Sequence, residues 1–206
     1  MSLFQKNYPP EIAQRIPPGQ RLVKSWPVLH YGPIPRFDGT NWDLTVSGLV
    51  EVPFTLTYEE LRALPNVTVD ADMHCVTGWT TLDNTWEGVS FRTIVERAKP
   101  LPEATWVIAH APGYTSNLSL QAMLDDDVLL AWRNHGEDLT DEHGWPLRLV
   151  VPKRYAWKST KWLTGLEFAA ENRRGFWEIR GYHVHAEPFA EERYAHQEHA
   201  RAELEP

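Results

Sequence analysis

Hydrophobic residues alternate with polar ones along several short stretches of the chain, as they do in strands with one buried face. Trp42, Leu44 and Val46 are separated by single polar residues, and 67–69 is a run of β-branched residues. Both stretches therefore predict strands. Three further strands are predicted from apolar stretches at 106–110, at 129–132 and within 143–152.

Short helices are predicted between these strands. Thr57 and Glu60 have the spacing of a capping box, which indicates a helix that starts there and ends near residue 64. Ser90 can cap a helix over 91–98, because the apolar residues of that stretch recur on one helical face.

Polar segments predict two turns. Residues 113–118 are polar and form an expected turn before a brief helix near 119–124. Residues 134–137 combine asparagine, histidine, glycine and glutamate and indicate a hairpin-like turn between two strands.

The composition divides the chain into a body and two flanks. Residues 1–36 are rich in proline, which disfavours helix interiors and central strands, so we expect an extended N-terminal arm there. Residues 187–206 are acidic and helix-prone and are expected to form a C-terminal tail or a docking segment. The predicted catalytic body is therefore 37–186.

Composition and charge exclude several classes of protein. A net charge of −8 argues against a general nucleic-acid binder, whose surface is basic. No apolar run approaches the roughly 20 residues of a membrane span. The N-terminus has neither a hydrophobic signal core nor a twin arginine, so a cytoplasmic location is expected. A single cysteine excludes an intrachain disulfide framework.

That cysteine, Cys75, lies among polar residues such as His74 and Thr77. Free cysteines are most often small buried hydrophobes, but these neighbours favour a polar loop between the strand at 67–69 and the helix at 91–98. A thiolate is both a nucleophile and a metal ligand, so both chemistries remain open. His74 is adjacent in sequence, yet neighbouring side chains on an extended chain point apart.

The sequence Cys-Val-Thr-Gly-Trp at 75–79, followed by Trp-Glu-Gly-Val-Ser-Phe at 86–91, resembles the cysteine loop of the sulfite-oxidase-type, molybdopterin-binding oxidoreductases. The resemblance implies an α+β fold: a mixed, β-sheet-rich sulfite oxidase catalytic domain with short peripheral helices. It also implies that the Cys75 thiolate binds molybdenum while an organic dithiolene supplies two more sulfurs. Soft sulfur ligands suit such a metal better than oxygen ligands do.

Residues 143–166 contain no acidic side chain, and basic and aromatic residues are interleaved within them. A solvated charged face is the ordinary interpretation of such a run. Lysine, arginine and hydroxyl groups can instead bind phosphate oxygens. The run resembles the part of the family that binds the pterin phosphate. The resemblance assigns cofactor binding to Arg148, Ser159, Thr160 and Lys161, with His143 as a polar contact to the pterin.

The resemblance assigns roles to two further places. His30 and Tyr31 lie in a segment similar to the one that lines the pterin pocket, although a plain loop is the alternative. Tyr114 lies where family members often carry a tyrosine facing the metal, which can donate a hydrogen bond while its ring walls the pocket. An ordinary surface turn is the alternative for Tyr114.

The function implied by the resemblance is molybdenum–pterin-dependent, two-electron oxygen-atom transfer on a small substrate of the S- or N-oxide type, or a sulfite-like one. Animal and plant sulfite oxidases have an arginine close after the cysteine, whereas here the first is Arg92, so sulfite itself is not favoured. Electrons are expected to pass through a separate haem or flavin protein. Alternatives are a non-catalytic carrier of the molybdenum cofactor, a ligand-binding module, and a cysteine hydrolase that uses Cys75.

Overall fold

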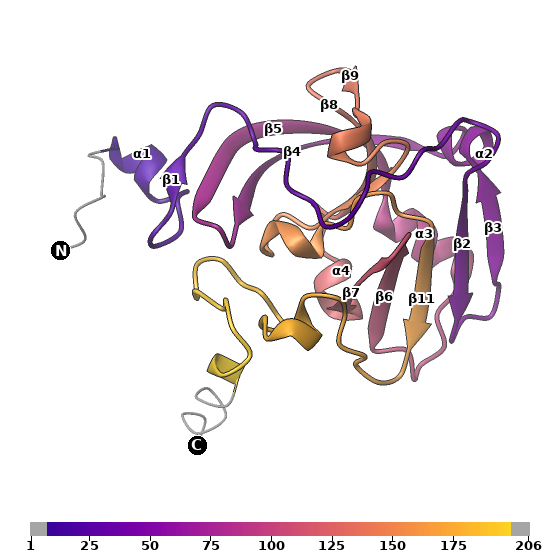
Figure 1. The fold of residues 1–206 in the computed structure, drawn as a ribbon. Coiled ribbons are helices and arrows are strands. Elements are labelled where there is room, and N and C mark those ends of the chain that lie inside the picture. The colour runs from indigo at the N-terminus through magenta and orange to yellow at the C-terminus, as the bar shows by residue number, and fades with distance from the viewer. Residues whose placement is uncertain (1–7, 199–206) are drawn as a thin grey trace.

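The computed structural model describes residues 8–198, whose strands form two sheets (Figure 1). The first sheet has the order β1-β5-β8-β10, with β4 also paired to β5 and β9 to β8. Its β1–β5 pair is parallel and its other pairs are antiparallel. The strands are β1 (Arg21–Leu22), β4 (Asn66–Cys75), β5 (Trp79–Ser90), β8 (Leu129–Asn134), β9 (Glu137–Asp138) and β10 (Arg148–Val150).

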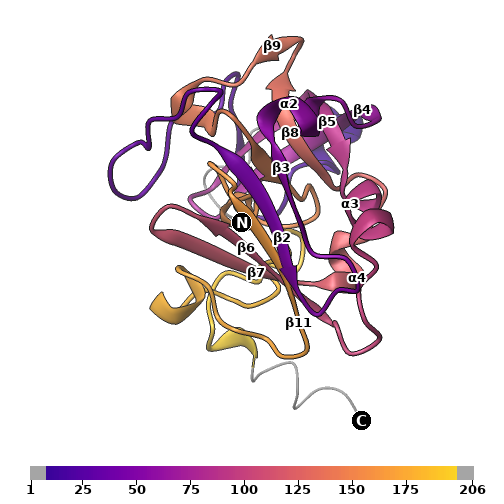
Figure 2. The same cartoon turned by 90° about the vertical axis from the view of Figure 1, so that its right-hand side faces the viewer.

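The second sheet has the order β3-β2-β11-β6-β7 and lies to one side of the first (Figure 2). Its β2 and β11 strands are parallel, so both sheets are mixed, as predicted. The strands are β2 (Asp43–Gly48), β3 (Phe54–Thr57), β6 (Trp106–Ala111), β7 (Tyr114–Ser119) and β11 (Gly165–Ala169).

The helices of the described chain are short and peripheral, which confirms the predicted fold class. They are α1 (Pro10–Ala13), α2 (Tyr58–Arg62), α3 (Phe91–Ala98) and α4 (Leu120–Met123), with the 3-10 turns η1 (Asp141–His143), η2 (Ala156–Lys158) and η3 (Glu178–Arg180). The predicted capping box is confirmed, because Thr57 Oγ1 accepts from the Glu60 amide and the Glu60 carboxylate accepts from the Thr57 amide. Ser90 caps α3.

Two local predictions are wrong. Cys75 does not lie in a loop between a short strand and a helix, because it ends the ten-residue strand β4, and the twelve-residue strand β5 follows after a turn at 76–78. The polar stretch 113–118 is mostly strand β7 rather than a turn. This strand can carry buried polar side chains because each has a hydrogen-bond partner. Ser116 Oγ pairs with Thr160 Oγ1, and Asn117 Oδ1 accepts from Lys158 Nζ.

The core consists of two clusters of buried side chains. The larger contains residues of both sheets and of α3, including Leu44, Phe91 and Phe168. The smaller surrounds the end of β4 and includes Met73, Cys75 and Trp86. The cysteine is therefore held at the edge of a rigid apolar cluster rather than in a mobile loop.

The N-terminal flank contacts the body near the start of β5. Strand β1 pairs with Trp79 and Thr80, while the side chain of Arg15 pairs with Asp72 and Asp83. The boundaries at residues 36 and 187 stay predictions, and the ends 1–7 and 199–206 lie outside the described residues. No helix within 8–198 is long and apolar enough to cross a membrane.

Candidate functional site

The turn after β4 presents Cys75 to a cavity. Gly78 has a φ of +90°, a left-handed conformation that favours glycine, and its amide donates to the Cys75 carbonyl at 2.9 Å. The Cys75 side chain is nearly buried, at 8% exposed, and its sulfur accepts a hydrogen bond from Thr77 Oγ1 at 3.2 Å. The turn thus fixes both the backbone and the thiol.

Burial raises the pKa of the Cys75 thiol, and the hydrogen bond from Thr77 and the charge of Arg193 oppose that rise only in part. His74 points to the other side of β4, where Nδ1 lies 3.0 Å from Thr80 Oγ1 and the ring packs edge-on against Phe189. The neighbouring imidazole therefore does not serve Cys75 as a base, which disfavours a hydrolase built on these two residues.

A cavity of about 340 Å³ adjoins the thiol, and all the residues predicted for the site line it. Strands β4, β7 and β10, the N-terminal flank and the segments around η1 and η2 each contribute to its wall. No acidic side chain of the described chain lines it, although the protein is acidic overall. The predicted residues brought together are His30, Tyr31, Cys75, Tyr114, His143, Arg148, Ser159, Thr160 and Lys161.

Arg148 is buried at 3% exposed and lies over the rings of Trp26 and Trp86. Its Nη1 and Nη2 donate to the carbonyls of His143 and Ser159 at 3.0 and 3.1 Å. Burial lowers its pKa to about 9, which leaves the guanidinium charged at neutral pH. No described carboxylate forms an ion pair with it.

Lys161 is held in the same way, because Nζ donates to the carbonyls of Leu29 and Glu142, both at 2.8 Å. Burial, followed by repulsion from Arg148, lowers its pKa to about 7. An ammonium has three donors, so one N–H remains for a ligand. The cavity therefore holds two cations whose charge is not neutralised by a described carboxylate.

The hydroxyl groups beside these cations have mixed roles. Ser159 Oγ accepts from the Val151 amide at 3.0 Å and keeps its own proton to donate. Thr160 Oγ1 pairs with Ser116 Oγ at 2.7 Å.

The Lys158 side chain is fully buried, and its Nζ pairs with the Glu178 carboxylate at 2.5 Å. A solvated charged face is thus the wrong interpretation for Arg148 and Lys158, while Lys153 is exposed.

The predicted aromatic and imidazole residues line the same cavity. The Tyr114 hydroxyl donates to the Trp157 carbonyl at 2.5 Å, and burial raises its pKa well above the ordinary value. Tyr31 is 64% exposed and packs against Phe176, whereas His30 Nδ1 lies 3.0 Å from the Gly32 carbonyl. The Tyr114 ring therefore lines the cavity, while its hydroxyl proton is already donated to the Trp157 carbonyl.

Sequence reasoning missed several residues of this site. Trp177 and Tyr182 line the cavity from a segment that follows β11, and Arg193 contacts the turn after Cys75. Trp26 and Trp79 also line it. The abundance of tryptophan was the one available signal, but it could not say which rings meet, because the lining tryptophans are spread along the chain at 26, 79, 157, 162 and 177.

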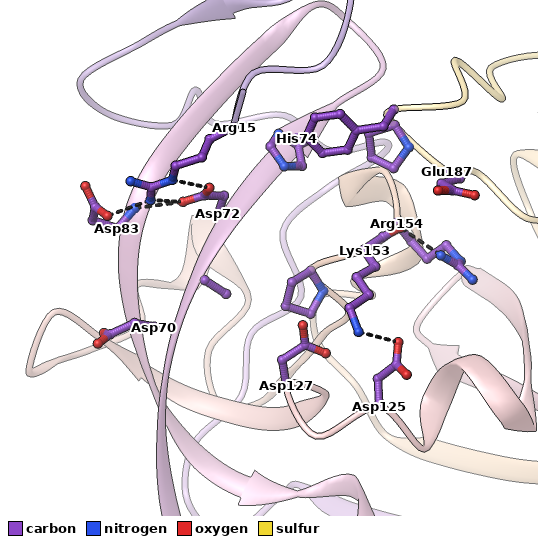
Figure 3. A pocket seen from close by; sticks show the side chains of 14 residues that line it. Arg15, Asp70, Asp72, His74, Asp83, Asp125, Asp127, Lys153, Arg154 and Glu187 are labelled. Atoms are coloured by element: carbon purple, nitrogen blue, oxygen red, sulfur yellow. Dashed lines mark hydrogen bonds and ion pairs between the residues drawn. The ribbon is translucent and has the colours of Figure 1, made fainter. Parts of the chain in front are cut away.

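A larger cavity, of about 660 Å³, lies on the other side of β4 (Figure 3). Its wall carries Asp70, Asp72 and His74 from β4, and Asp125, Asp127 and Lys153 face them. Some of the charged groups here are paired with one another, as Arg15 is with Asp72 at 2.6 Å and Lys153 with Asp125 at 3.1 Å. We refer to it as the acidic groove, and it contains none of the residues predicted for the site.

Comparison with known proteins agrees with the geometry. The family described as oxidoreductase molybdopterin binding domain matches residues 31–177. The chain is 46% identical over 193 residues to the uncharacterized oxidoreductase YuiH of Bacillus subtilis (strain 168), covering 93% of this chain and 98% of that protein.

Two other similar proteins are longer. The protein-methionine-sulfoxide reductase catalytic subunit MsrP of Campylobacter jejuni is 29% identical over 161 residues, covering 69% of this chain and 54% of MsrP. The crystal structure of the sulfane dehydrogenase SoxCD from Paracoccus pantotrophus superposes with a TM-score of 0.64 at 26% identity. That superposition covers 69% of this chain and 41% of the SoxCD chain, so the present chain spans about half or less of these two proteins.

Proposed function

Because the chain belongs to the family of oxidoreductases with a molybdopterin-binding domain, we propose that it transfers an oxygen atom to or from a small substrate with Cys75 as the metal ligand. The family match makes the protein a molybdopterin-dependent oxidoreductase whose cofactor is molybdenum bound to molybdopterin. The observation that carries the proposal is a cavity in which a thiol and two cations meet and which no acidic side chain of residues 8–198 lines.

The donor set of this cavity suits the cofactor. His143 Nε2 and Trp79 Nε1 are buried and have no hydrogen-bond partner among the described residues, although both side chains line the cavity. Trp79 Nε1 is a donor, and His143 Nε2 is a donor or an acceptor according to its tautomer; buried polar atoms without partners cost free energy unless a ligand satisfies them. A pterin ring offers acceptors at its edge and a phosphate offers anionic oxygens, so unused donors and unneutralised cations fit this group.

Each residue then has a role that its contacts support. Cys75 would hold the metal through Sγ, and the turn at 76–78 would set its direction. Lys161 and Arg148 would supply positive charge for the phosphate, and Ser159 a hydroxyl donor. When bound, the molybdenum–pterin group supplies the two-electron redox change. Tyr114 would act as a wall, because its hydroxyl already donates to the Trp157 carbonyl.

We extend the proposal to a neutral S- or N-oxide as substrate. Arg92 forms an ion pair with Asp126 and is 51% exposed, so it does not serve as an anion-binding group beside Cys75. Aromatic rings such as Trp157 and Tyr182 line the cavity instead. MsrP, which is similar to this chain, is named as a methionine-sulfoxide reductase. Reduction of an S-oxide consumes two electrons and two protons and releases water.

We propose a separate haem or flavin protein as the electron-transfer partner. MsrP, which is similar to this chain, is named as a catalytic subunit, and this supports the proposal. The cytoplasmic location stays a prediction.

The test combines composition with turnover. Purified protein should contain molybdenum and pterin in equal amounts and reduce a small sulfoxide or N-oxide with an artificial electron donor. Sulfite oxidation should be much slower, and efficient sulfite oxidation would overturn the substrate assignment. Protein without molybdenum would favour the hydrolase or the ligand-binding module. Loaded protein that turns over none of these substrates would favour the cofactor carrier.

A further inference from the structure

The turn that follows Cys75 is held by a residue from the far end of the chain. Arg193 Nη1 donates to the Val76 carbonyl at 2.7 Å, a contact that spans 117 residues of sequence. Its Nη2 donates to the Pro18 carbonyl at 3.3 Å, so one guanidinium joins the turn to both flanks. Figure 1 shows residues 178–198, which we call the C-terminal segment, in yellow beside the free end of the β4–β5 hairpin.

The backbone of the turn has few other anchors. The Cys75 carbonyl accepts from the Gly78 amide at 2.9 Å, and the Gly78 carbonyl accepts from the Arg21 amide at 3.0 Å. The Val76 carbonyl, in contrast, has a charged side chain as its donor. Hydrogen bonds from charged groups are stronger than those between neutral groups, so we expect the bond from Arg193 to hold this turn more firmly than either of its two backbone bonds.

Arg193 is itself well fixed. Its guanidinium lies over the ring of Tyr155, 5.4 Å from the centroid, and its side chain is 19% exposed. Its amide donates to Gln197 Oε1 at 2.8 Å, and its carbonyl accepts from the His183 amide at 3.2 Å. A side chain whose backbone and ring contacts are set in advance can position its partner with little loss of entropy.

The contact lies beyond the part of the chain that matches the family, which ends at residue 177. Tyr182, from the same segment, lines the cavity beside Cys75. The C-terminal segment therefore does more than cover the body, since it reaches the metal-binding turn and the cavity wall together.

We propose that Arg193 is a positioning residue that fixes the turn at 76–78, so that Cys75 Sγ meets the metal in one orientation. The inference rests on the proposed role of Cys75 as the metal ligand. Without Arg193 the Val76 carbonyl loses its donor and the turn would sample other conformations, so Cys75 Sγ would hold a metal in a less defined direction.

The first test uses cofactor-free protein and hydrogen exchange at the Gly78 and Trp79 amides. Arg193→Gln should raise exchange there roughly 10-fold or more, because a charge-assisted bond is lost. Arg193→Lys keeps a charge but not the planar guanidinium, so the exchange rate of these two amides should lie between those of the wild type and Arg193→Gln. Arg173→Gln is the matched control, because Arg173 is 56% exposed and pairs with Glu167 on β11. Arg173→Gln removes the same charge and should leave the exchange rates of the Gly78 and Trp79 amides unchanged.

The second test uses loaded protein and the molybdenum(V) electron paramagnetic resonance spectrum. Arg193→Gln should broaden or shift that spectrum at unchanged molybdenum content, and Arg193→Lys should restore most of it. Unchanged exchange in Arg193→Gln would overturn the contact's role, and faster exchange with an unchanged spectrum would overturn the positioning of the metal ligand. Wild-type protein that binds no molybdenum would overturn the proposed function, and exchange in cofactor-free protein would then decide the role of Arg193 at the turn by itself.

Discussion

The two sides of β4 differ in charge although one strand separates them. Met73 and Cys75 face a cavity that no acidic side chain of the described chain lines, whereas Asp72 and His74 face the acidic groove. Side chains alternate across a strand, so neighbouring residues enter opposite environments. An acidic protein can therefore keep a cavity free of carboxylates by directing them to the far side of the same strand.

The two sides also differ in how their cations are held. In the cavity, Arg148 and Lys161 donate to backbone carbonyls, which leaves their net charge available to a ligand. In the groove, Lys153 and Arg15 are paired with carboxylates. Removing a cation from the cavity should therefore weaken cofactor binding, whereas removing Lys153 or Arg15 from the groove should change only surface ion pairing.

The largest effect is expected for Arg148→Ala. The substitution leaves the His143 and Ser159 carbonyls without their donor and removes a buried charge. Cofactor affinity should fall on the order of 100-fold, and the free energy of unfolding by about 3 kcal/mol. Pterin per protein, measured after oxidation to its fluorescent form, and urea unfolding check both values. Wild-type pterin occupancy would show that the guanidinium does not contribute to the site.

Lys161→Ala should have a smaller effect, because one ammonium N–H is free for the phosphate. We expect roughly 10-fold weaker retention of the pterin, with a fold that remains intact. Lys153→Ala is the matched control: it removes the same side chain from the acidic groove, where Lys153 is paired with Asp125. Equal pterin occupancy in Lys161→Ala and Lys153→Ala would contradict a role in cofactor binding that is specific to the cavity lysine.

Cofactor binding should weaken with rising pH. The Lys161 pKa is lowered to about 7, so the ammonium of the cofactor-free protein loses its proton as the pH rises through neutrality. A bound anion favours the protonated form, so affinity is highest below that pKa. If only this form binds, affinity falls about tenfold between pH 6 and pH 8. Lys161→Arg should bind with a flatter pH profile, and an equally steep profile would assign the effect to another group.

The smallest effect is expected on the groove side. Arg15→Gln removes the ion pairs with Asp72 and Asp83, both at 2.6 Å, that connect the N-terminal flank to the sheet. Exposed or half-exposed pairs contribute little, so the free energy of unfolding should fall by about 1 kcal/mol or less, and less still at high salt. Pterin occupancy should stay at the wild-type value. A large loss of pterin would mean that the groove and the cavity are coupled.

Local signals explain which parts of the fold could be predicted. The capping box at Thr57 and the strand at 106–110 depend on neighbouring residues, and both were predicted correctly. Strand β7 was missed because its polar residues are tolerated only through partners such as Thr160. Strand β5 was missed because its glycine and polar residues conceal the alternation, and β4 supplies its long pairing partner.

The candidate site shows the same division. His143, Arg148 and Lys161 fall within one acid-free run, so a resemblance over that run could find them. Trp26 and Arg193 come from the two flanks and Tyr182 from the end of the body, and only the folded chain brings them to Cys75. Contacts of this kind have no signature in the spacing of residues, which is why His30 and Tyr31 were the only flank residues predicted for the site, and those two came from the family resemblance.

The central claim is that Cys75 binds the metal, and X-ray absorption at the molybdenum edge tests it most directly. Wild-type protein and Cys75→Ser should be compared after loading with the same cofactor. The serine variant should retain pterin, since Arg148 and Lys161 are unchanged, but its molybdenum should have one fewer sulfur neighbour. An identical number of sulfur neighbours in the two proteins would contradict the assignment of Cys75 as the metal ligand.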